Sequence, residues 1–434
     1  MFKWIELKRK QKEFLNLMAK MKMERYYLVD MKEFTNGYRL IIGIYAGGSI
    51  SEFTKHKEEL DNWLGCISRI TPIRFTNTFI MDCCTVDVGK YEFEPVKTKP
   101  TQLYIGKTFF NENYFIDITK DPHLAIFGMT GSGKSMLLAI VLTNLIYNHS
   151  KEIELYLCQT HKRDLDLFKY CSCVKLNCYT SQETKFVLEK ALKCIQDRSI
   201  KFAELGIKDI TQYNRVNGHK MKRKFYIFEE ISLYTPSETD SDDEYALKEI
   251  VWRLLLNILK LGRSAGIHVI MLSQRSTVSN LGGKNGDVKS NLTKITFYQN
   301  SNTNSQNVLD TNDATRLDNL ECCVLDTKGI TVIKVPYVDE DMTILHKYVP
   351  EMHIFGVKTV NKNNVNFKKQ VEYVNFSQEN TIKTTTNSNK LLKIEQKTQK
   401  NDKNSTEFNE NQSKITNNSN NSNKLLKKGV ICDE

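Results

Sequence analysis

The sequence predicts an α/β protein whose mainly parallel sheet is sandwiched by helices. From about residue 116 to 350, short apolar runs alternate with long helical patterns. That alternation is typical of parallel strands joined by helical crossovers. From about residue 375, Asn, Lys, Thr, Ser and Gln dominate and apolar residues become scarce. Such a segment cannot bury enough surface to offset its ordering entropy, so we expect a disordered tail.

These shifts in composition divide the chain into four expected parts. The first part mixes short helical and strand patterns, with a strand at 38–44 and an amphipathic helix at 52–67, and nothing in it looks catalytic. The parts are a small N-terminal α+β domain at 1–115, the α/β domain at 116–350, a linker or domain end at 351–374, and the disordered tail at 375–434.

The α/β domain is expected to hold alternating strands and long helices. Apolar runs predict its strands, at 123–127, 153–158, 225–228, 267–272, 295–298 and 322–325. Apolar residues at helical spacing predict its long helices, at 134–147, 183–205 and 245–261.

Bulk properties limit the class of protein. The chain has 434 residues, 40% of them hydrophobic, and a formal net charge of +11, which is compatible with a polyanionic partner. Its 11 cysteines lack paired spacing for zinc, which favours reduced thiols inside a cell. No window approaches the roughly 20 apolar residues of a membrane span, and the charged start lacks a signal-peptide core. We therefore expect a cytoplasmic protein.

A glycine-rich turn is the strongest local signal. It fits the pattern G-x-x-x-x-G-K-[ST] between an apolar strand-like run and an apolar helical run, the setting that a phosphate-binding loop requires. Glycines let backbone N–H groups surround phosphates, and a helix start favours anions. Lys134 can reach the β- and γ-phosphates of ATP, and the Ser135 hydroxyl can ligate Mg²⁺. The expected ATP-binding residues are Gly128, Met129, Thr130, Gly131, Ser132, Gly133, Lys134 and Ser135.

Two acids follow the apolar run 225–228. A phosphate-binding loop works with a carboxylate at the end of a neighbouring strand, and Glu229 and Glu230 occupy that place. We predict that Glu229 holds Mg²⁺ together with Ser135, usually through water, and that Glu230 orients or deprotonates the attacking water. The first position is usually Asp. Its replacement by Glu adds a methylene, so the coordination would need a compensating backbone shift.

Residues 259–275, LKLGRSAGIHVIMLSQR, narrow the choice among ATPases. This stretch resembles the FtsK/SpoIIIE signature, in which a helix ends in (K/G)-R-(A/S)-A-G-I-H and a strand ends in (T/S)-Q-R. Ser276 stands where the family usually has Pro, and Thr160-His161 stand where it has Asp-Pro. The resemblance covers about residues 115–340 and implies a RecA-like P-loop NTPase motor domain that hydrolyses ATP.

The resemblance also implies further catalytic residues besides Lys134 and Glu230. Arg263 matches the arginine that reaches across a subunit boundary to a neighbour's ATP, where a cation stabilises the transferring phosphoryl group. The alternative for Arg263 is a surface residue at a helix C-terminus, where cations are favoured. Gln274 matches the polar sensor of the γ-phosphate. For Arg275, a structural ion pair is an equal alternative.

An arginine acting between subunits implies a ring, in this family a homohexamer. Double-stranded DNA would pass through its channel, contacted at phosphates and therefore independently of sequence. Residues 276–290, with Lys284 and Lys289, are one candidate channel loop, and an ordinary surface loop is the alternative.

One motor domain without a membrane domain or winged helix is similar to FtsK-like DNA-transfer proteins of Gram-positive conjugative elements. Such coupling proteins deliver relaxase-bound DNA to a transfer channel. The resemblance therefore implies relaxase and membrane-channel partners, and recruitment to the inner face of the cell membrane. Two alternatives stay open: an ATPase of a protein-secretion system, and a nucleotide-switched DNA-binding accessory protein. The DNA source and the direction of travel are not readable from the residues.

Overall fold

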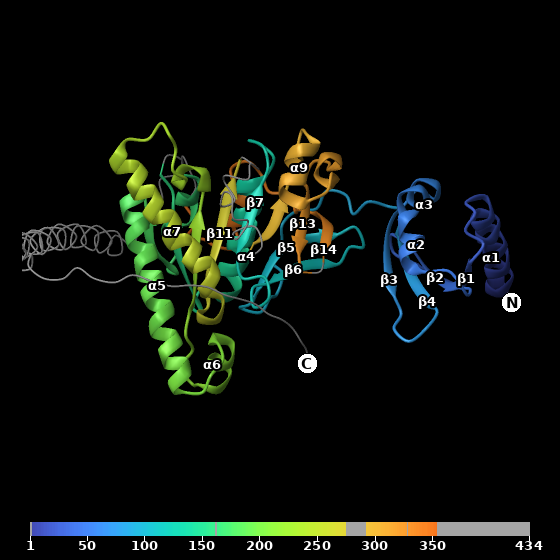
Figure 1. Ribbon diagram of the computed structural model, residues 1–434, viewed down its shortest axis with the longest axis horizontal. Helices are drawn as coiled ribbons and strands as arrows, with labels where there is room; N and C mark the ends of the chain where they lie inside the picture. The colour runs from blue at the N-terminus through green and yellow to red at the C-terminus, as the bar shows by residue number, and fades with distance from the viewer. Residues whose placement is uncertain (1, 161–162, 275–291, 328, 354–434) are drawn as a thin grey trace, which may run out of the picture. The chain divides into compact units, whose positions relative to one another are not determined.

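A computed structural model describes residues 2–160, 163–274, 292–327 and 329–353 (Figure 1). These ranges contain a four-stranded sheet and a ten-stranded sheet. The predicted tail at 375–434 lies outside them. The predicted domain limits at 115, 350 and 374 stay predictions.

The four-stranded sheet is antiparallel throughout, in the order β1-β2-β4-β3. Tyr26, Phe53 and Phe79 pack edge to face in its core, with ring centroids 4.7–6.4 Å apart. Its elements are α1 (Phe2–Lys20), β1 (Tyr26–Phe34), β2 (Gly37–Ile44), α2 (Ile50–Lys55), α3 (Lys57–Leu64), β3 (Ile67–Pro72) and β4 (Thr78–Cys84).

The helix predicted over 52–67 was wrong in its extent. It is divided into α2 and α3, and α3 ends at Leu64 because Gly65 takes the left-handed conformation of a helix cap (φ 60°). Ile67 is the first residue of β3, and Trp63 in the last turn of α3 is 58% exposed. The apolar spacing continued past a glycine that stops the helix.

The ten-stranded sheet has the order β6-β5-β14-β13-β12-β7-β11-β10-β8-β9. From β12 to β9 every neighbouring pair is parallel, whereas β12 to β6 pair antiparallel. Its strands are β5 (Gln102–Thr108), β6 (Asn113–Asp117), β7 (Leu124–Phe127), β8 (Ile153–Cys158), β9 (Val174–Cys178), β10 (Arg223–Phe228), β11 (Ile267–Ser273), β12 (Thr293–Thr296), β13 (Glu321–Asp326) and β14 (Gly329–Lys334). The predicted mainly parallel sheet is confirmed.

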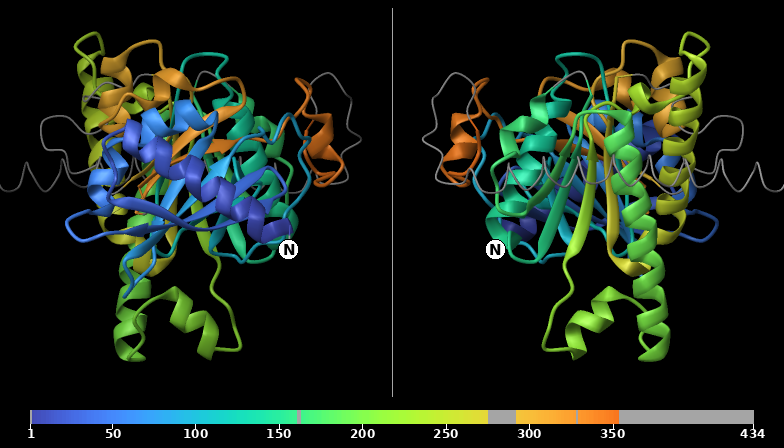
Figure 2. Two further views of the ribbon diagram at one scale, coloured as in Figure 1. Left: turned by 90° about the vertical axis from the view of Figure 1, so that its right-hand side faces the viewer. Right: turned by 90° about the vertical axis from the view of Figure 1, so that its left-hand side faces the viewer.

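Helices cover both faces of this sheet, with α4 on one side and α5 and α7 on the other (Figure 2). This arrangement confirms the predicted sandwich. The α-helices are α4 (Lys134–His149), α5 (Ser181–Glu204), α6 (Ile210–Val216), α7 (Asp242–Ala265), α9 (Asn302–Leu309) and α10 (Thr343–His346). The short 3₁₀ helices are η1 (Asp164–Phe168), η2 (Ile231–Tyr234) and η5 (Asp313–Arg316). None of the helices in the described ranges has the length and apolar character that crossing a membrane requires.

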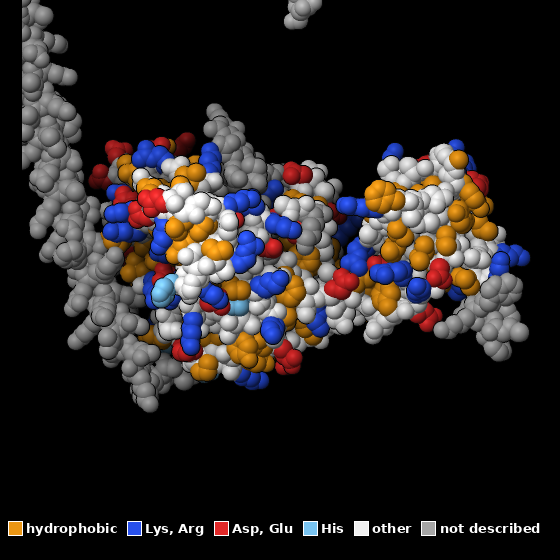
Figure 3. Space-filling view, turned by 90° about the horizontal axis from the view of Figure 1, so that it is seen from below, with side chains coloured by type: hydrophobic (Ala, Val, Ile, Leu, Met, Phe, Trp, Pro, Cys, Tyr) orange, Lys and Arg blue, Asp and Glu red, His pale blue; other side chains and the backbone are white. Residues whose placement is uncertain are grey.

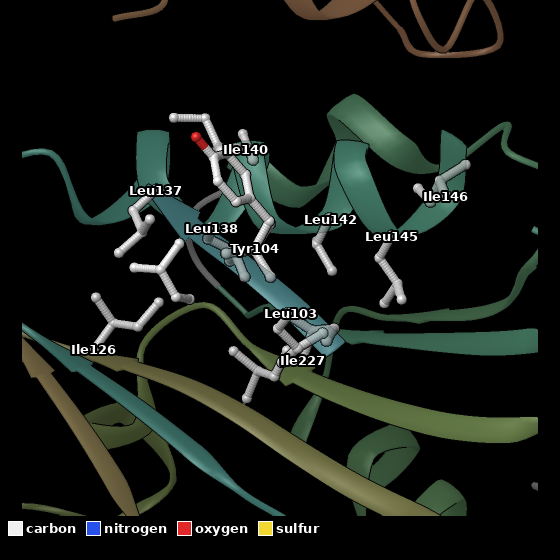
Figure 4. Close-up of a cluster of buried hydrophobic side chains, with 14 of the residues drawn as sticks. Leu103, Tyr104, Ile126, Leu137, Leu138, Ile140, Leu142, Leu145, Ile146 and Ile227 are labelled. Atoms are coloured by element: carbon white, nitrogen blue, oxygen red, sulfur yellow. The ribbon is translucent and has the colours of Figure 1, made fainter. Parts of the chain in front are cut away.

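The main core lies between α4 and the sheet (Figure 4). Leu137 and Leu142 of α4 are fully buried, as are Ile126 of β7 and Ile227 of β10. Almost every side of α4 is apolar, as expected of a helix enclosed by protein. The core therefore anchors α4, and with it the turn that precedes the helix.

Truncating this core is expected to destabilise the fold. Leu137→Ala should lower the free energy of unfolding by about 2–5 kcal/mol, because a buried leucine leaves a cavity when it is shortened. Chemical denaturation would measure the change. Leu261→Ala, at a site that is 55% exposed, is the matched control and should shift the midpoint little. Equal losses in the two variants would contradict this assignment of the core.

Candidate nucleotide-binding site

Parallel strands bring most of the predicted site residues, though not Arg263, to one edge of the sheet. β7, β11, β10 and β8 are neighbours in that order, so their carboxyl ends lie together. The loop 128–135 follows β7, Gln274 follows β11, and Glu229 and Glu230 follow β10. This edge is where open α/β sheets bind ligands.

The loop after β7 needs its glycines. Gly128 has φ +154°, and a Cβ at this position would collide with the Ser132 Oγ atom. Gly133 has φ +106° and is the last residue before α4. Residues that carry a side chain rarely adopt such backbone conformations. Glycine at these two positions therefore lets the chain turn tightly into the start of α4. Met129 and Thr130 are exposed at its tip.

Lys134 lies along this loop. Its Nζ donates hydrogen bonds to the carbonyl oxygens of Gly128 (2.7 Å) and Met129 (2.6 Å), and its side chain is largely buried. The buried Ser132 Oγ has no hydrogen-bond partner among the described atoms. An ammonium group, a hydroxyl and a helix start at one turn all favour an anion with several acceptor oxygens. A polyphosphate meets that requirement.

Glu230 is held in a fixed position. Its carboxylate accepts hydrogen bonds from the Ser232 Oγ (2.7 Å) and from the Gln274 backbone N–H (3.1 Å). The side chain is only 6% exposed. A carboxylate oriented in this way beside a phosphate-binding loop can act as a general base toward water.

Gln274 connects the end of β11 to the loop. Its side-chain Oε1 accepts a hydrogen bond from the Thr130 hydroxyl at 3.3 Å, and its backbone N–H contacts Glu230. One residue therefore contacts both the loop and the predicted base. That is the position expected of a group that responds to the terminal phosphate.

Asp164 joins Ser135 to Glu229 and was not among the predicted site residues. The Ser135 hydroxyl donates to Asp164 Oδ2 at 3.3 Å, and the Asp164 N–H donates to Glu229 Oε1 at 3.2 Å. The three residues line a cavity of about 390 Å³ beside α4. The place of Asp164, six residues after the end of the parallel strand β8, was the signal that could have identified it.

Arg263 lies away from these residues, in the last turn of α7 at the amino end of β11. β11 has seven residues and the loop is at its other end, so the separation is about 20 Å at roughly 3.3 Å per residue. The exposed Arg263 donates from Nε to the Thr119 carbonyl oxygen at 2.7 Å. The fold thus brings together Lys134, Glu230 and Gln274, but not Arg263.

Two further predictions cannot be compared with the structure. Arg275 and the candidate channel loop 276–290 lie outside the described residues.

The donor set suits a magnesium ion bound mainly through a substrate. Ser135, Asp164 and Glu229 offer oxygen atoms only, which Mg²⁺ prefers. Within the described ranges, no cluster of three or more His, Cys, Asp or Glu side chains could hold a metal ion. Mg²⁺ commonly binds through one or two carboxylates plus phosphate oxygens and water, so this arrangement fits that ion.

Comparison with known proteins agrees with this geometry. Residues 91–275 match the model of the FtsK/SpoIIIE family. DNA translocase FtsK of Caldanaerobacter subterraneus is 27% identical over 220 residues, and that of Lactococcus lactis 28% over 236 residues. These matches cover 49% and 52% of this chain but only 29% and 30% of the relatives' length.

Two solved structures share the fold. The monomer form of the pCW3 conjugation coupling protein TcpA, solved with ATPgS, aligns with a TM-score of 0.54 and 17% identity, covering 79% of this chain and 99% of that one. EssC (ATPases 2 and 3) of Geobacillus thermodenitrificans aligns with a TM-score of 0.50 and 18% identity, covering 61% and 50%. The loop, the acidic pair and Gln274 all lie within residues 91–275, the stretch of this chain that matches the FtsK/SpoIIIE family model.

Proposed function

We propose that this chain is an ATP-hydrolysing motor that moves double-stranded DNA during conjugative transfer. The observation that carries the proposal is the meeting of Lys134, Glu230 and Gln274 at one sheet edge, with Gln274 contacting both the loop and the base. The relatives are named DNA translocases, and one structural neighbour is named a conjugation coupling protein. These names support DNA as the substrate and transfer as the setting.

Each residue of the site has a proposed role. The loop 128–135 holds the triphosphate of ATP through backbone N–H groups, and Lys134 exchanges its carbonyl partners for phosphate oxygens. Ser135 and Glu229 would both belong to the Mg²⁺ site, and the ion would neutralise phosphate charge when bound. Glu230 takes a proton from the attacking water, and its hydrogen bonds from Ser232 and Gln274 orient its carboxylate.

Arg263 is proposed to act on the neighbouring subunit's ATP. Its distance from its own loop and its exposed position support that direction of action. A site completed by the next subunit requires a ring, and we propose a homohexamer with DNA in its channel. Relaxase and membrane-channel partners, and recruitment to the inner face of the cell membrane, belong to the same proposal.

DNA contact is proposed to be electrostatic and independent of sequence. Figure 3 presents one face on which Lys and Arg side chains are interspersed with Asp, Glu and apolar groups, without one continuous basic patch. The net charge of +11 supports contact with phosphates. Binding of this kind weakens steeply as salt rises, because counterions are released from DNA.

An ATPase assay with and without long duplex DNA tests the proposal. Wild-type protein should hydrolyse ATP faster when DNA is added. Lys134→Ala should weaken ATP binding by about ten- to a hundredfold, the range expected for losing charged hydrogen bonds. Lys193→Ala, at an exposed lysine of α5, is the control and should behave as wild type. A rate that does not respond to DNA would favour the secretion ATPase.

A further inference from the structure

We propose that Asp164 is the carboxylate that contacts the divalent cation beside Ser135, and that Glu229 acts by holding Asp164 in place. This inference rests on the proposed function, because it assigns a residue to the same ATP site. It deepens that function by assigning the direct contact with the cation to Asp164, the first residue of η1, instead of to Glu229, which follows β10.

The contacts around Ser135 support this assignment. The Ser135 hydroxyl donates a hydrogen bond to the Asp164 carboxylate, with 3.3 Å between the two oxygens. A hydroxyl that ligates Mg²⁺ through its oxygen needs its proton directed to a neighbouring acceptor, and Asp164 Oδ2 provides that acceptor. Ser135 and Asp164 are both exposed, so both can reach an ion that arrives with ATP.

Glu229 differs from Asp164 in burial and in bonding. It is 6% exposed, and its Oε1 accepts the backbone N–H of Asp164 at 3.2 Å. The longer glutamate side chain lets a residue at the end of β10 reach the start of η1. This contact explains the presence of Glu at the first acidic position: the side chain spans to the neighbouring segment and orients it, and is thus a positioning residue.

The cavity beside these residues leaves room for the cation's water ligands. Its volume is about 390 Å³, and Asp164 lies on its wall. Mg²⁺ loses water reluctantly and usually keeps several water ligands, so a site with space beside one or two carboxylates suits it. The exposed residue Asp341 lines the same cavity.

Titration of cation-dependent nucleotide binding tests the assignment. Binding of a fluorescent ATP analogue to the full chain would be measured in EDTA and then over a range of Mg²⁺ concentrations. Asp164→Asn should bind as wild type does in EDTA, yet need at least about tenfold more Mg²⁺ for tight binding. Asp341→Asn removes the same charge from the same cavity and is the matched control, with a Mg²⁺ dependence like wild type.

Glu229 variants separate positioning from direct contact. Glu229→Gln keeps an acceptor oxygen for the Asp164 N–H, so its Mg²⁺ requirement should rise less than that of Asp164→Asn. Glu229→Ala removes the acceptor and should approach the effect of Asp164→Asn. Electron paramagnetic resonance of Mn²⁺ bound with ATP should change in Asp164→Asn and stay close to wild type in Glu229→Gln.

The outcomes distinguish this inference from the proposed function. If wild type binds ATP with Mg²⁺ and hydrolyses it, but Asp164→Asn titrates like wild type, only the inference fails. Equal shifts in Asp164→Asn and Asp341→Asn would also overturn it, because they would indicate a general charge effect. If wild type binds no ATP under any condition, the proposed function fails and the inference with it.

Discussion

Glu230→Gln is expected to lower ATP turnover by at least about a hundredfold, the smallest usual contribution of a general base. The amide cannot take a proton from water, but it has nearly the same shape as the carboxylate. It keeps an oxygen that can accept the bonds from Ser232 and Gln274. ATP binding should therefore stay within a few fold of wild type. Steady-state ATPase rates and nucleotide-binding titrations would measure both effects.

The control for this variant is Glu238→Gln, at an exposed glutamate in the loop before α7. It should hydrolyse ATP at the wild-type rate. A Glu230→Gln protein with undiminished turnover would remove Glu230 from the mechanism. A variant that lost turnover but still supported DNA transfer in cells would instead favour the nucleotide-switched accessory protein over a motor.

Arg263→Ala should lower the ATPase rate by about a thousandfold while leaving ATP affinity near wild type, as expected for an arginine that stabilises phosphoryl transfer from a neighbouring subunit. The affinity for ATP should stay near that of wild type because Arg263 and the loop 128–135 of the same subunit lie at opposite ends of the parallel strands. A rate assay and a binding titration on the same protein would separate the two effects.

Mixing two inactive variants tests whether Arg263 acts between subunits. Arg263→Ala protein supplies an intact loop and Lys134→Ala protein supplies an intact arginine, so mixed rings should recover part of the activity. Arg253→Ala, at another exposed arginine of α7, is the control and should remain active alone. Mixtures that stay inactive, or an Arg263→Ala protein with full activity, would contradict a role between subunits. Arg263 would then be only a surface residue at the C-terminus of α7.

Strand and helix patterns identified most of the parallel half of the large sheet, although β9 was not among the predicted strands. β8 was predicted at 153–158 and lies at Ile153–Cys158, and α4 begins at Lys134 as predicted. Both elements are largely buried, so their sequences are mostly apolar and easily recognised. The antiparallel strands β5 and β6 were not predicted. β5 pairs with β14, which lies more than 200 residues later in the chain, and a local pattern cannot reveal such a pairing.

The phosphate-binding loop and the acidic pair could be predicted because each depends on residues that are neighbours in the chain. The glycine-rich turn, its lysine and the helix after it are consecutive, and the acidic pair follows its strand directly, so spacing alone predicted the loop 128–135 and the residues Glu229 and Glu230. The resemblance added Gln274 and Arg263, whose roles stay predictions. What spacing could not provide was which of these groups touch one another.

The tertiary structure decided those contacts, because they join residues far apart in the chain. Thr130 and Gln274 are 144 positions apart, and Asp164 and Glu229 are 65 apart. They meet because β11 lies between β7 and β10 while β8 flanks β10, an order set by helix packing and crossover connections. The sequence alone thus determined a phosphate-binding loop with a nearby acid. Only the sheet order placed Asp164 between Ser135 and Glu229, and Arg263 at the opposite edge.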